Sequence, residues 1–416
     1  MISVAEAEAL IAGVLPARRI EERELEDAAG LALAEDYHAK EDSPRFTNSA
    51  MDGFAARFED IAAASERAWL TIADVVAAGD DAPTLLSEGC VVRVATGAPV
   101  PENADVVAPI EDCVAHGEFV RITASNLTRG QYIRRRGAEY RVGAALLRKG
   151  SVCTPPRIAL AAQNGISRLR VFAPPRVALL STGNEIVGIA ESLGGAQARN
   201  ANIPLLKASL RAITPSQPII PIVERHARDG YEETREALAD CASAADIVIS
   251  TGGVSVGAMD WIKKAAEDEG FETVLWRVRQ KPGKPMYVAR KRGVGEGKGD
   301  VLLFGLPGNP VSTLITFARY ARPVLRLLCG LDSKEETQEA VIGQSLANMQ
   351  GRAEFVRVRL KWSGQDSERS STLPTAIPLA KQDSFMLTSL ADADGFVFLE
   401  DGERLAAGDR VRVTLL

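Results

Sequence analysis

Residues 246–257 read Asp-Ile-Val-Ile-Ser-Thr-Gly-Gly-Val-Ser-Val-Gly, an apolar run that leads directly into a glycine-rich loop. Two other segments have the same form: Val-Ala-Leu-Leu-Ser-Thr-Gly-Asn-Glu at 177–185 and Val-Leu-Leu-Phe-Gly-Leu-Pro-Gly-Asn-Pro at 301–310. Helical periodicity lies between them at 229–242 and 258–268. This alternation predicts a parallel α/β sheet over residues 174–328, with all three loops at the carboxyl ends of the strands, where such sheets bind ligands.

The composition is typical of a multidomain globular protein. With 46% hydrophobic and 25% charged residues, the 416-residue chain can supply cores for two to four domains of about 150 residues. Its formal net charge of −6 opposes polyanions, so we expect no nucleic-acid partner. No uncharged apolar run approaches the roughly 20 residues that span a bilayer, and the N-terminus does not resemble a signal peptide. We therefore expect a cytoplasmic protein without membrane contact.

The cysteines and histidines give little sign of metal or nucleophile chemistry. The five cysteines lie far apart without a CxxC pair, which argues against a disulfide framework or a zinc site and favours a reducing compartment. His38, His116 and His226 show no metal-ligand spacing, so we expect isolated surface or loop residues. None of the three is placed as a convincing base for a serine or cysteine nucleophile.

The N-terminal part of the chain divides into segments of different composition and residue pattern. Residues 1–40, rich in Ala, Glu and Leu, predict two helices separated at residues 28–30. Together with residues 151–173 they are predicted to form a helical linking domain. Residues 41–150 carry short β-rich runs between turn clusters and predict an inserted β-rich domain. Its expected strands include residues 90–95 and 104–110.

The C-terminal part of the chain, residues 329–416, predicts a β domain of barrel-like form. Strands are expected near 354–361 and 409–415. The predicted fold class is therefore an α/β and β multidomain chain. It comprises the N-terminal linking domain, the inserted β-rich domain, the central parallel sheet and this C-terminal domain.

The three glycine-rich loops predict an anion site. Glycine lets the backbone turn sharply and leaves amide N–H groups free to bind phosphate at a helix N-terminus. None matches GxGxxG or GxxxxGK[ST], so the loops are neither a dinucleotide fingerprint nor a Walker loop. One such loop is equally explained as an ordinary βα turn, but three at one sheet edge favour a binding site. The residues expected to contact the ligand are Thr182, Gly183, Gly252, Gly253, Ser255 and Gly257.

A basic and rigid segment follows at residues 281–285, Lys-Pro-Gly-Lys-Pro. The prolines restrict the chain around Lys281 and Lys284, which lowers the entropy cost of holding two ammonium groups near an anion. The alternative interpretation is a solvated basic loop. Further along, Asn309 and Pro310 are typical of a helix N-cap and first helical position, and need no ligand to explain them.

Acidic side chains at loop ends are candidates for a divalent cation. Glu185 follows the first strand, Asp260 follows the second loop, and Asp52 lies within residues 48–54. Glu185 with Asp260 would suffice for Mg²⁺, which needs one or two protein carboxylates when water and substrate phosphates complete its coordination. Solvation explains Glu185 alone, and the following helix dipole explains Asp260 alone. The residues thus predict a site that binds a phosphorylated ligand and a second anion, acting by positioning and electrostatics.

Seven strings occur in a fixed order along the chain. They are Pro-Arg-Phe-Thr-Asn-Ser-Ala-Met-Asp-Gly-Phe-Ala at 44–55, Ala-Thr-Gly-Ala-Pro-Val-Pro at 95–101, Arg-Arg-Arg-Gly at 134–137, Leu-Ser-Thr-Gly-Asn-Glu at 180–185, Thr-Gly-Gly-Val-Ser-Val-Gly at 251–257, Lys-Pro-Gly-Lys-Pro at 281–285 and Gly-Leu-Pro-Gly-Asn-Pro at 305–310. Together they resemble the molybdopterin molybdenumtransferase family, the MoeA proteins and the E domain of gephyrin. The resemblance covers essentially the whole chain.

This resemblance implies insertion of molybdate into adenylylated molybdopterin, with Mg²⁺-dependent release of AMP, to give the molybdenum cofactor. It implies four domains per subunit, the third shared with molybdopterin adenylyltransferases, and a homodimer with the site in a cleft between subunits. The implied partners are adenylylated molybdopterin, molybdate and a second copy of the chain. Contacts with molybdopterin adenylyltransferase and with molybdoenzymes are also implied.

Matching by position, the resemblance assigns roles to individual residues. The implied catalytic residues are Asp52, Asp229, Asp260, Lys281 and Lys284, and the implied Mg²⁺ ligands are Glu185 and Asp260. The implied binding residues, besides those of the loops, are Thr96, Pro307, Pro310, Arg352 and Ser384. Departures from the family pattern occur at Glu139, Asn200, Ala258 and Arg277. Arg277 stands where a lysine is common and, being always charged, cannot shift a proton as a lysine can.

Two other functions stay open on the sequence. A molybdopterin adenylyltransferase would use the same α/β domain. A catalytically weak binding or scaffold protein is favoured by the departures at Asn200 and Arg277.

Overall fold

The computed structural model describes residues 1–64, 68–81, 85–123, 127–214, 216–254, 261–293, 299–334, 336–362 and 373–416. They form two compact units. Unit 1 comprises Met1–Glu35, Lys149–Ile158 and Arg168–Leu416, and unit 2 comprises Asp36–Arg148 and Ala159–Ser167. The four domain boundaries expected from the sequence stay predictions. Among the described residues, no helix has both the length and the apolar character that a bilayer span requires.

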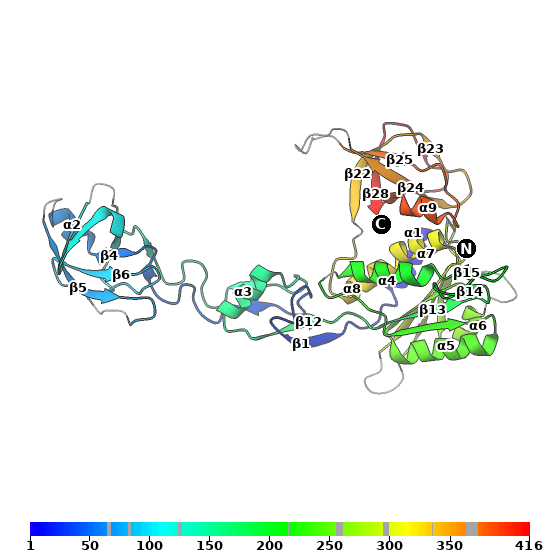
Figure 1. The fold of residues 1–416 in the computed structure, drawn as a ribbon, viewed down its shortest axis with the longest axis horizontal. Helices are drawn as coiled ribbons and strands as arrows, with labels where there is room; N and C mark the ends of the chain where they lie inside the picture. The colour runs from blue at the N-terminus through cyan, green and yellow to red at the C-terminus, as the bar shows by residue number, and fades with distance from the viewer. Residues whose placement is uncertain are drawn as a thin grey trace. The chain divides into compact units, whose positions relative to one another are not determined.

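The centre of unit 1 is a six-stranded sheet with the order β16-β13-β17-β21-β20-β18. Figure 1 labels its strand β13, with α4 (Asn202–Ile213) and α5 (Tyr231–Ala244) on opposite sides of it. The strands are β13 (Val177–Thr182), β16 (Val223–Ala227), β17 (Ile247–Thr251), β18 (Glu272–Trp276), β20 (Tyr287–Lys291) and β21 (Val301–Leu306). The first four in the order are parallel, which confirms the predicted sheet. β18 and β20 are antiparallel, because residues 277–286 join them without a crossover helix. The expectation of a wholly parallel sheet was therefore incomplete.

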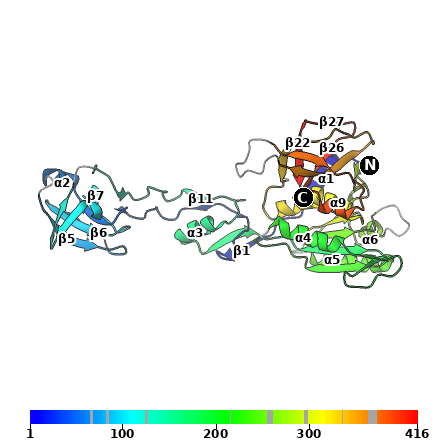
Figure 2. The same cartoon turned by 45° about the horizontal axis from the view of Figure 1, so that its top comes forward.

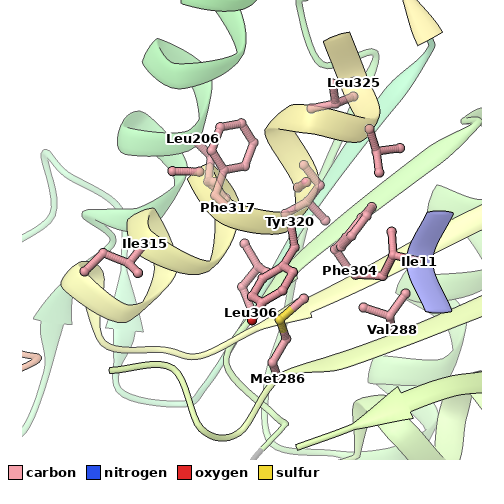
Figure 3. Close-up of a cluster of buried hydrophobic side chains, with 14 of the residues drawn as sticks. Ile11, Leu206, Met286, Val288, Phe304, Leu306, Ile315, Phe317, Tyr320 and Leu325 are labelled. Atoms are coloured by element: carbon pink, nitrogen blue, oxygen red, sulfur yellow. The ribbon is translucent and has the colours of Figure 1, made fainter. Parts of the chain in front are cut away.

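Helices cover both faces of this sheet. On one face lie α1 (Val4–Ala12), α4 (Asn202–Ile213), α7 (Pro310–Thr316), the π-helical turn η2 (Phe317–Ala321) and α8 (Arg322–Leu328). On the other face lie α5 (Tyr231–Ala244) and α6 (Ile262–Asp268), which correspond to the helices expected at 229–242 and 258–268. Phe304 of β21 packs with Phe317 and Tyr320 on the first face (Figure 3), whereas Leu303 faces the second. Burial on both faces explains why the strands read as continuous apolar runs.

The N-terminal segment differs from the prediction of two helices. After α1 the chain forms β1 (Ile20–Glu24), which pairs antiparallel with β12 (Arg168–Phe172). Arg168 forms ion pairs across this ladder with Glu22 and Glu24. The charges that suggested a helical face are therefore cross-strand partners, and the second helix of the prediction is wrong.

The C-terminal part of unit 1 is a second six-stranded sheet with the order β19-β24-β25-β22-β28-β26. Its strands β22 and β26 are labelled in Figure 2. Its strands are β19 (Gln280–Lys281), β22 (Thr337–Ile342), β24 (Ala353–Lys361), β25 (Thr375–Pro378), β26 (Gly395–Leu399) and β28 (Arg410–Leu415). β24 also pairs with β26, so the sheet closes in the predicted barrel-like manner. The smaller elements of this part are α9 (Leu387–Ala391), β23 (Leu346–Ala347) and β27 (Arg404–Leu405).

One strand of that sheet comes from the central region of the chain. β19 belongs to the basic segment predicted as a rigid turn, and it pairs in parallel with β24. Lys281 thereby lies opposite Glu354. The basic segment is thus part of the C-terminal sheet, although it follows β18 of the central sheet in sequence.

Unit 2 contains a six-stranded sheet with the order β7-β4-β6-β5-β9-β8. Its strands are β4 (Gly53–Ala56), β5 (Leu70–Val76), β6 (Cys90–Val94), β7 (Val106–Pro109), β8 (Cys113–His116) and β9 (Phe119–Ile122). β6 and β7 are the strands predicted at 90–95 and 104–110. Two short ladders join β3 (Asn48–Ser49) to β10 (Ile133–Arg134) and β2 (Tyr37–His38) to β11 (Ala145–Leu147).

The remaining elements are short. They are α2 (Phe58–Ala64), the 3-10 turn η1 (Ile110–Asp112), α3 (Pro155–Gln163), β14 (Ile186–Val187) and β15 (Ala198–Arg199). α3 confirms only part of the helix expected over 151–173, because residues 168–172 form β12, which pairs with β1. The five cysteines are free thiols.

Candidate functional site

A pocket of about 680 Å³ lies in unit 1, at the carboxyl ends of β13, β17 and β21. We name its side formed by residues 181–182, 251–252 and 307–310 the glycine wall, and its side formed by residues 280–285, 352 and 382–384 the basic wall. Residues 185–186, 198–202 and 312 complete the lining. The three loops predicted to meet at one sheet edge do so.

Nine of the site residues predicted from the sequence line this pocket. They are Thr182, Glu185, Gly252, Lys281, Lys284, Pro307, Pro310, Arg352 and Ser384. Gly183, Gly253 and Asp229 do not line it, Asp52 and Thr96 belong to unit 2, and Ser255, Gly257 and Asp260 lie outside the described residues.

Gly252 is required in the glycine wall for space and not for a free amide. Gly252 has a φ of +86°, and a Cβ there would lie 2.7 Å from Thr182 Oγ1. Its N–H donates to the Leu306 carbonyl at 3.1 Å, and the N–H of Gly183 donates to the Ala227 carbonyl at 3.2 Å. The prediction that these two amides are free for a phosphate is wrong, because the parallel ladders continue into both loops.

A serine and a histidine meet at the end of β13. Ser181 is buried, lines the pocket, and lies opposite His226 of β16. Ser181 Oγ is 3.0 Å from His226 Nδ1. His226 is exposed, as expected, but it is not isolated, because Ser181 lies within hydrogen-bond distance. Sequence spacing did not reveal the pair because the strands are neighbours only in the folded sheet.

The loop after β13 is held by a reciprocal pair of hydrogen bonds. Asn184 N–H donates to Asp229 Oδ2 and Asp229 N–H donates to Asn184 Oδ1, each at 3.1 Å. Asp229 therefore positions this loop. A Cβ on Gly183 would lie 2.6 Å from a carboxylate oxygen of Glu185, so the space beside Gly183 is filled by that carboxylate.

The described residues fit a Mg²⁺ ion that is held largely by its substrate. Glu185 presents a carboxylate to the pocket. Among the described residues, no three His, Cys, Asp or Glu side chains form a closed metal site. Mg²⁺ is commonly bound by one or two carboxylates together with water and substrate phosphates, and Glu185 meets that requirement.

Two asparagines beside the glycine wall were not singled out as ligand contacts from the sequence. Asn202 Nδ2 donates to the Gly308 carbonyl at 2.7 Å, while its buried Oδ1 has no partner among the described residues. Asn200 Oδ1 accepts from the N–H of Ile203 in the first turn of α4 at 3.2 Å. Asn200, a departure from the family pattern, thus supports the helix that begins beside the pocket.

The basic wall is organised by a buried glutamine that the sequence analysis did not identify. Gln280 Nε2 donates to the Gly283 carbonyl at 3.2 Å, and Tyr320 OH donates to Gln280 Oε1. Burial raises the pKa of Tyr320, which keeps its hydroxyl protonated as a donor. Lys281 and Lys284 both line the pocket from this turn. Arg277 does not line the pocket. Its guanidinium lies 4.1 Å from the centroid of the Trp276 ring.

A buried arginine holds residues 382–384. Arg357 of β24 is 0% exposed, and its Nη2 donates to the carbonyls of Lys381 at 2.8 Å and Asp383 at 3.2 Å. Its Nε donates to Ser389 Oγ at 3.1 Å. Burial lowers the pKa of Arg357, because the charged guanidinium is removed from water. Its neighbours in sequence gave no sign of this role.

Ser384 joins the two walls. Asn309 Nδ2 donates to Ser384 Oγ at 2.8 Å, and Val311 N–H donates to the Ser384 carbonyl at 3.3 Å. Asn309 is the N-cap residue of α7 and Pro310 opens the helix, as predicted, but the Asn309 side chain does not cap. Nearby, Arg352 Nε is buried and has no partner among the described residues, which suits an anion.

Two further predicted residues contact each other in unit 2. Thr96 N–H donates to Asp52 Oδ1 at 2.6 Å. In the same unit Ser43 Oγ donates to Glu139 Oε2 at 2.7 Å, so the departure at Glu139 is engaged in a hydrogen bond. Asp52 and Thr96 thus form one small cluster at the start of β4 and the end of β6.

Three family models match consecutive parts of the chain. Residues 2–165 match the MoeA N-terminal region (domain I and II), residues 178–327 match a probable molybdopterin binding domain, and residues 339–416 match the MoeA C-terminal region (domain IV). The chain is 32% identical over 424 residues to molybdopterin molybdenumtransferase 2 of Mycobacterium tuberculosis, covering 99% of both. It is 33% identical over 397 residues to molybdopterin molybdenumtransferase of Synechococcus elongatus, covering 92% of this chain and 91% of the relative.

The fold is similar to that of a solved relative over its full length. The crystal structure of a molybdopterin biosynthesis MoeA protein from Pyrococcus horikoshii superposes with a TM-score of 0.82 at 29% identity, covering 100% of this chain and 99% of the other. These matches extend through both units and the whole pocket region. The chain therefore belongs to the molybdopterin molybdenumtransferase family.

Proposed function

We propose that this chain inserts molybdate into adenylylated molybdopterin and releases AMP. The observation that carries the proposal is the pocket of about 680 Å³. Lys281, Lys284 and Arg352 line it together with the glycine wall. That volume is in the range of sites for small-molecule ligands. The relatives named molybdopterin molybdenumtransferase support the same activity. A molybdopterin adenylyltransferase is not favoured, because the matches include the regions before and after the central domain.

In the proposed reaction the chain acts by positioning. Lys281, Lys284 and Arg352 bind the oxyanion and oppose its negative charge. Thr182 and Asn202 offer polar groups to the other ligand from the glycine wall and its edge. When bound by Glu185, together with Asp260, Mg²⁺ would neutralise charge on the phosphates as the phosphoanhydride bond breaks. Holding both reactants in one pocket removes the entropy cost of their encounter.

The proposal extends to a cytoplasmic homodimer. The resemblance supports a site completed at a subunit boundary, for which Asp52 and Thr96 of unit 2 form a hydrogen-bonded cluster. Adenylylated molybdopterin and molybdate are the proposed substrates, and molybdopterin adenylyltransferase and molybdoenzymes are proposed contacts.

The test is AMP release by the purified chain. With adenylylated molybdopterin, molybdate and Mg²⁺ present, AMP should appear, and omission of molybdate or Mg²⁺ should reduce its rate at least about tenfold. A Glu185→Ala, Asp260→Ala double variant should lose AMP release, and normal release would remove both residues from the site. As a matched control we choose Glu191→Ala, an exposed glutamate outside the pocket lining.

The same assay separates the remaining functions. ATP-dependent adenylylation of free molybdopterin by this chain alone would instead support an adenylyltransferase. Absence of AMP release, together with failure to restore molybdoenzyme activity in a strain without the inserting enzyme, would support a scaffold protein.

A further inference from the structure

The two lysines of the basic wall have different partners. Lys281 Nζ lies 3.0 Å from Glu354 Oε1, and its side chain is 33% exposed. Lys284 lies three residues further along the same turn, is exposed, and forms no ion pair with a carboxylate among the described residues. Both side chains line the pocket. The same wall therefore contains one neutralised ammonium group and one that is available to an anion.

The position of Glu354 is fixed by its surroundings. The parallel pairing of β19 with β24 places Lys281 opposite Glu354. Gln350 Nε2 donates to the second carboxylate oxygen at 3.4 Å, and the Glu354 side chain is only 13% exposed. Glu354 itself does not line the pocket. Its carboxylate therefore contacts the ammonium group of a pocket-lining lysine, although Glu354 is not part of the lining.

This carboxylate is close enough to oppose a bound oxyanion. Two charge-assisted contacts of about 3 Å in series, carboxylate to ammonium and ammonium to oxyanion, place the two negative groups within about 6 Å. That separation is shorter than the Debye length of about 8 Å at physiological ionic strength, and partial burial weakens screening further. Glu354 must both repel the oxyanion and compete with it for the hydrogens of Lys281 Nζ.

We propose that Glu354 sets the affinity of the basic wall by weakening oxyanion binding at Lys281, so that the wall exchanges small dianions instead of retaining them. With Lys281, Lys284 and Arg352 around one pocket, a basic wall without this carboxylate would bind any small dianion tightly and exchange it slowly. This inference rests on the proposed function, in which the oxyanion is a substrate.

The test measures binding of sodium molybdate and of sodium sulfate to the full chain by isothermal titration calorimetry at low salt. Glu354→Gln keeps the shape and the hydrogen-bonding oxygen but removes the charge. It should bind both dianions about tenfold more tightly than the wild type, equivalent to about 1.4 kcal/mol. In 0.5 M NaCl the gain should shrink to about threefold or less, because salt screens the repulsion.

Two variants separate charge from position. Glu354→Asp keeps the charge and should stay within about threefold of the wild-type affinity. Glu272→Gln removes a carboxylate that is ion-paired with Arg290 and Arg292, outside the pocket lining, and should bind as the wild type does. If Glu354→Gln lowers the melting temperature strongly, the binding measurement is repeated with Glu354→Ala. This variant also lacks the charge and should also bind molybdate more tightly than the wild type.

Equal or weaker binding by the charge-removing variants would overturn the inference, and so would the absence of binding by every variant. An equal gain in Glu272→Gln would also overturn it, since the effect would then reflect net charge alone. Measuring AMP release by the same wild-type preparation distinguishes failure of the proposed function from failure of this inference. If AMP is released and Glu354→Gln shows no gain in affinity, only this inference fails.

Discussion

The glycine wall and the basic wall enclose one pocket but are built in different ways. The glycine wall consists of strand ends, and each of its loops follows its own strand directly in sequence. The basic wall is assembled from residues 280–285, 352 and 382–384, which are up to about 100 residues apart and are joined by a strand pairing and by one buried arginine. One wall is therefore stabilised by the central core, and the other by a few specific side-chain contacts.

This difference predicts that the basic wall is sensitive to single polar substitutions. Arg357→Met should lower the free energy of unfolding by about 3 kcal/mol, because the carbonyls of Lys381 and Asp383 would each lose a buried charged donor. Urea unfolding would measure the loss. Arg359→Met is the matched control, since Arg359 lies on the same strand but is 52% exposed in its ion pair with Asp392. A loss below about 1 kcal/mol in Arg357→Met would show that the arginine does not hold the wall.

A backbone substitution in the basic turn tests the same wall. Gly283 has a φ of +93°, and a Cβ there would lie 2.4 Å from Thr316 Cγ2. Gly283→Ala should therefore cost about 2 kcal/mol and weaken molybdate binding. Gly270, with a φ of +82° and open space around it, provides the control, and Gly270→Ala should cost about 1 kcal/mol without affecting binding. Equal costs would mean that the close approach to Thr316 is not important.

A side-chain truncation at the edge of the glycine wall should have a smaller effect. Asn202→Ala removes the hydrogen bond to the Gly308 carbonyl and should lower the free energy of unfolding by about 1 kcal/mol. Because the strands keep their core, the thermal midpoint should move by only a few degrees. A loss as large as that of Arg357→Met would contradict the contrast between the walls.

The connection between the walls should matter least for stability. Ser384→Ala removes the acceptor of Asn309 Nδ2 at an exposed position, so the expected loss is about 0.5 kcal/mol. Its effect should instead appear as a rise in the KM for the adenylylated substrate at nearly unchanged kcat, because Ser384 holds the two walls together. An unchanged KM would assign Ser384 to the fold alone.

The sequence predicted the glycine wall well and the basic wall only in part. Strand positions, the loop edge and the N-cap position of Asn309 follow from local periodicity and turn chemistry, and the structure confirms them. Lys281 and Lys284 were also recognised, because prolines and glycine mark their turn. Gln280, Glu354 and Arg357 were not, since nothing in their immediate sequence distinguishes them from ordinary strand residues.

Local sequence also led to wrong predictions where pairing with a distant strand determines the conformation or the hydrogen-bond partner of a residue. The glutamates of β1 suggested a helix, but their partner Arg168 lies far along the chain. The amides of Gly183 and Gly252 were expected to be free, but neighbouring strands supply their acceptors. Likewise, His226 meets Ser181 only because β16 lies beside β13 in the sheet.

The sequence by itself determined the central sheet, its glycine-rich edge and, through strings spread along the whole chain, the family. These features depend on periodicity, turn residues and motif order, all of which are local in the chain. Only the tertiary structure decided that the basic turn joins the C-terminal sheet, that Glu354 neutralises Lys281 and that Arg357 holds the opposite segment. Such contacts depend on strand pairing and burial between distant residues, and neither is encoded in the residues next to them.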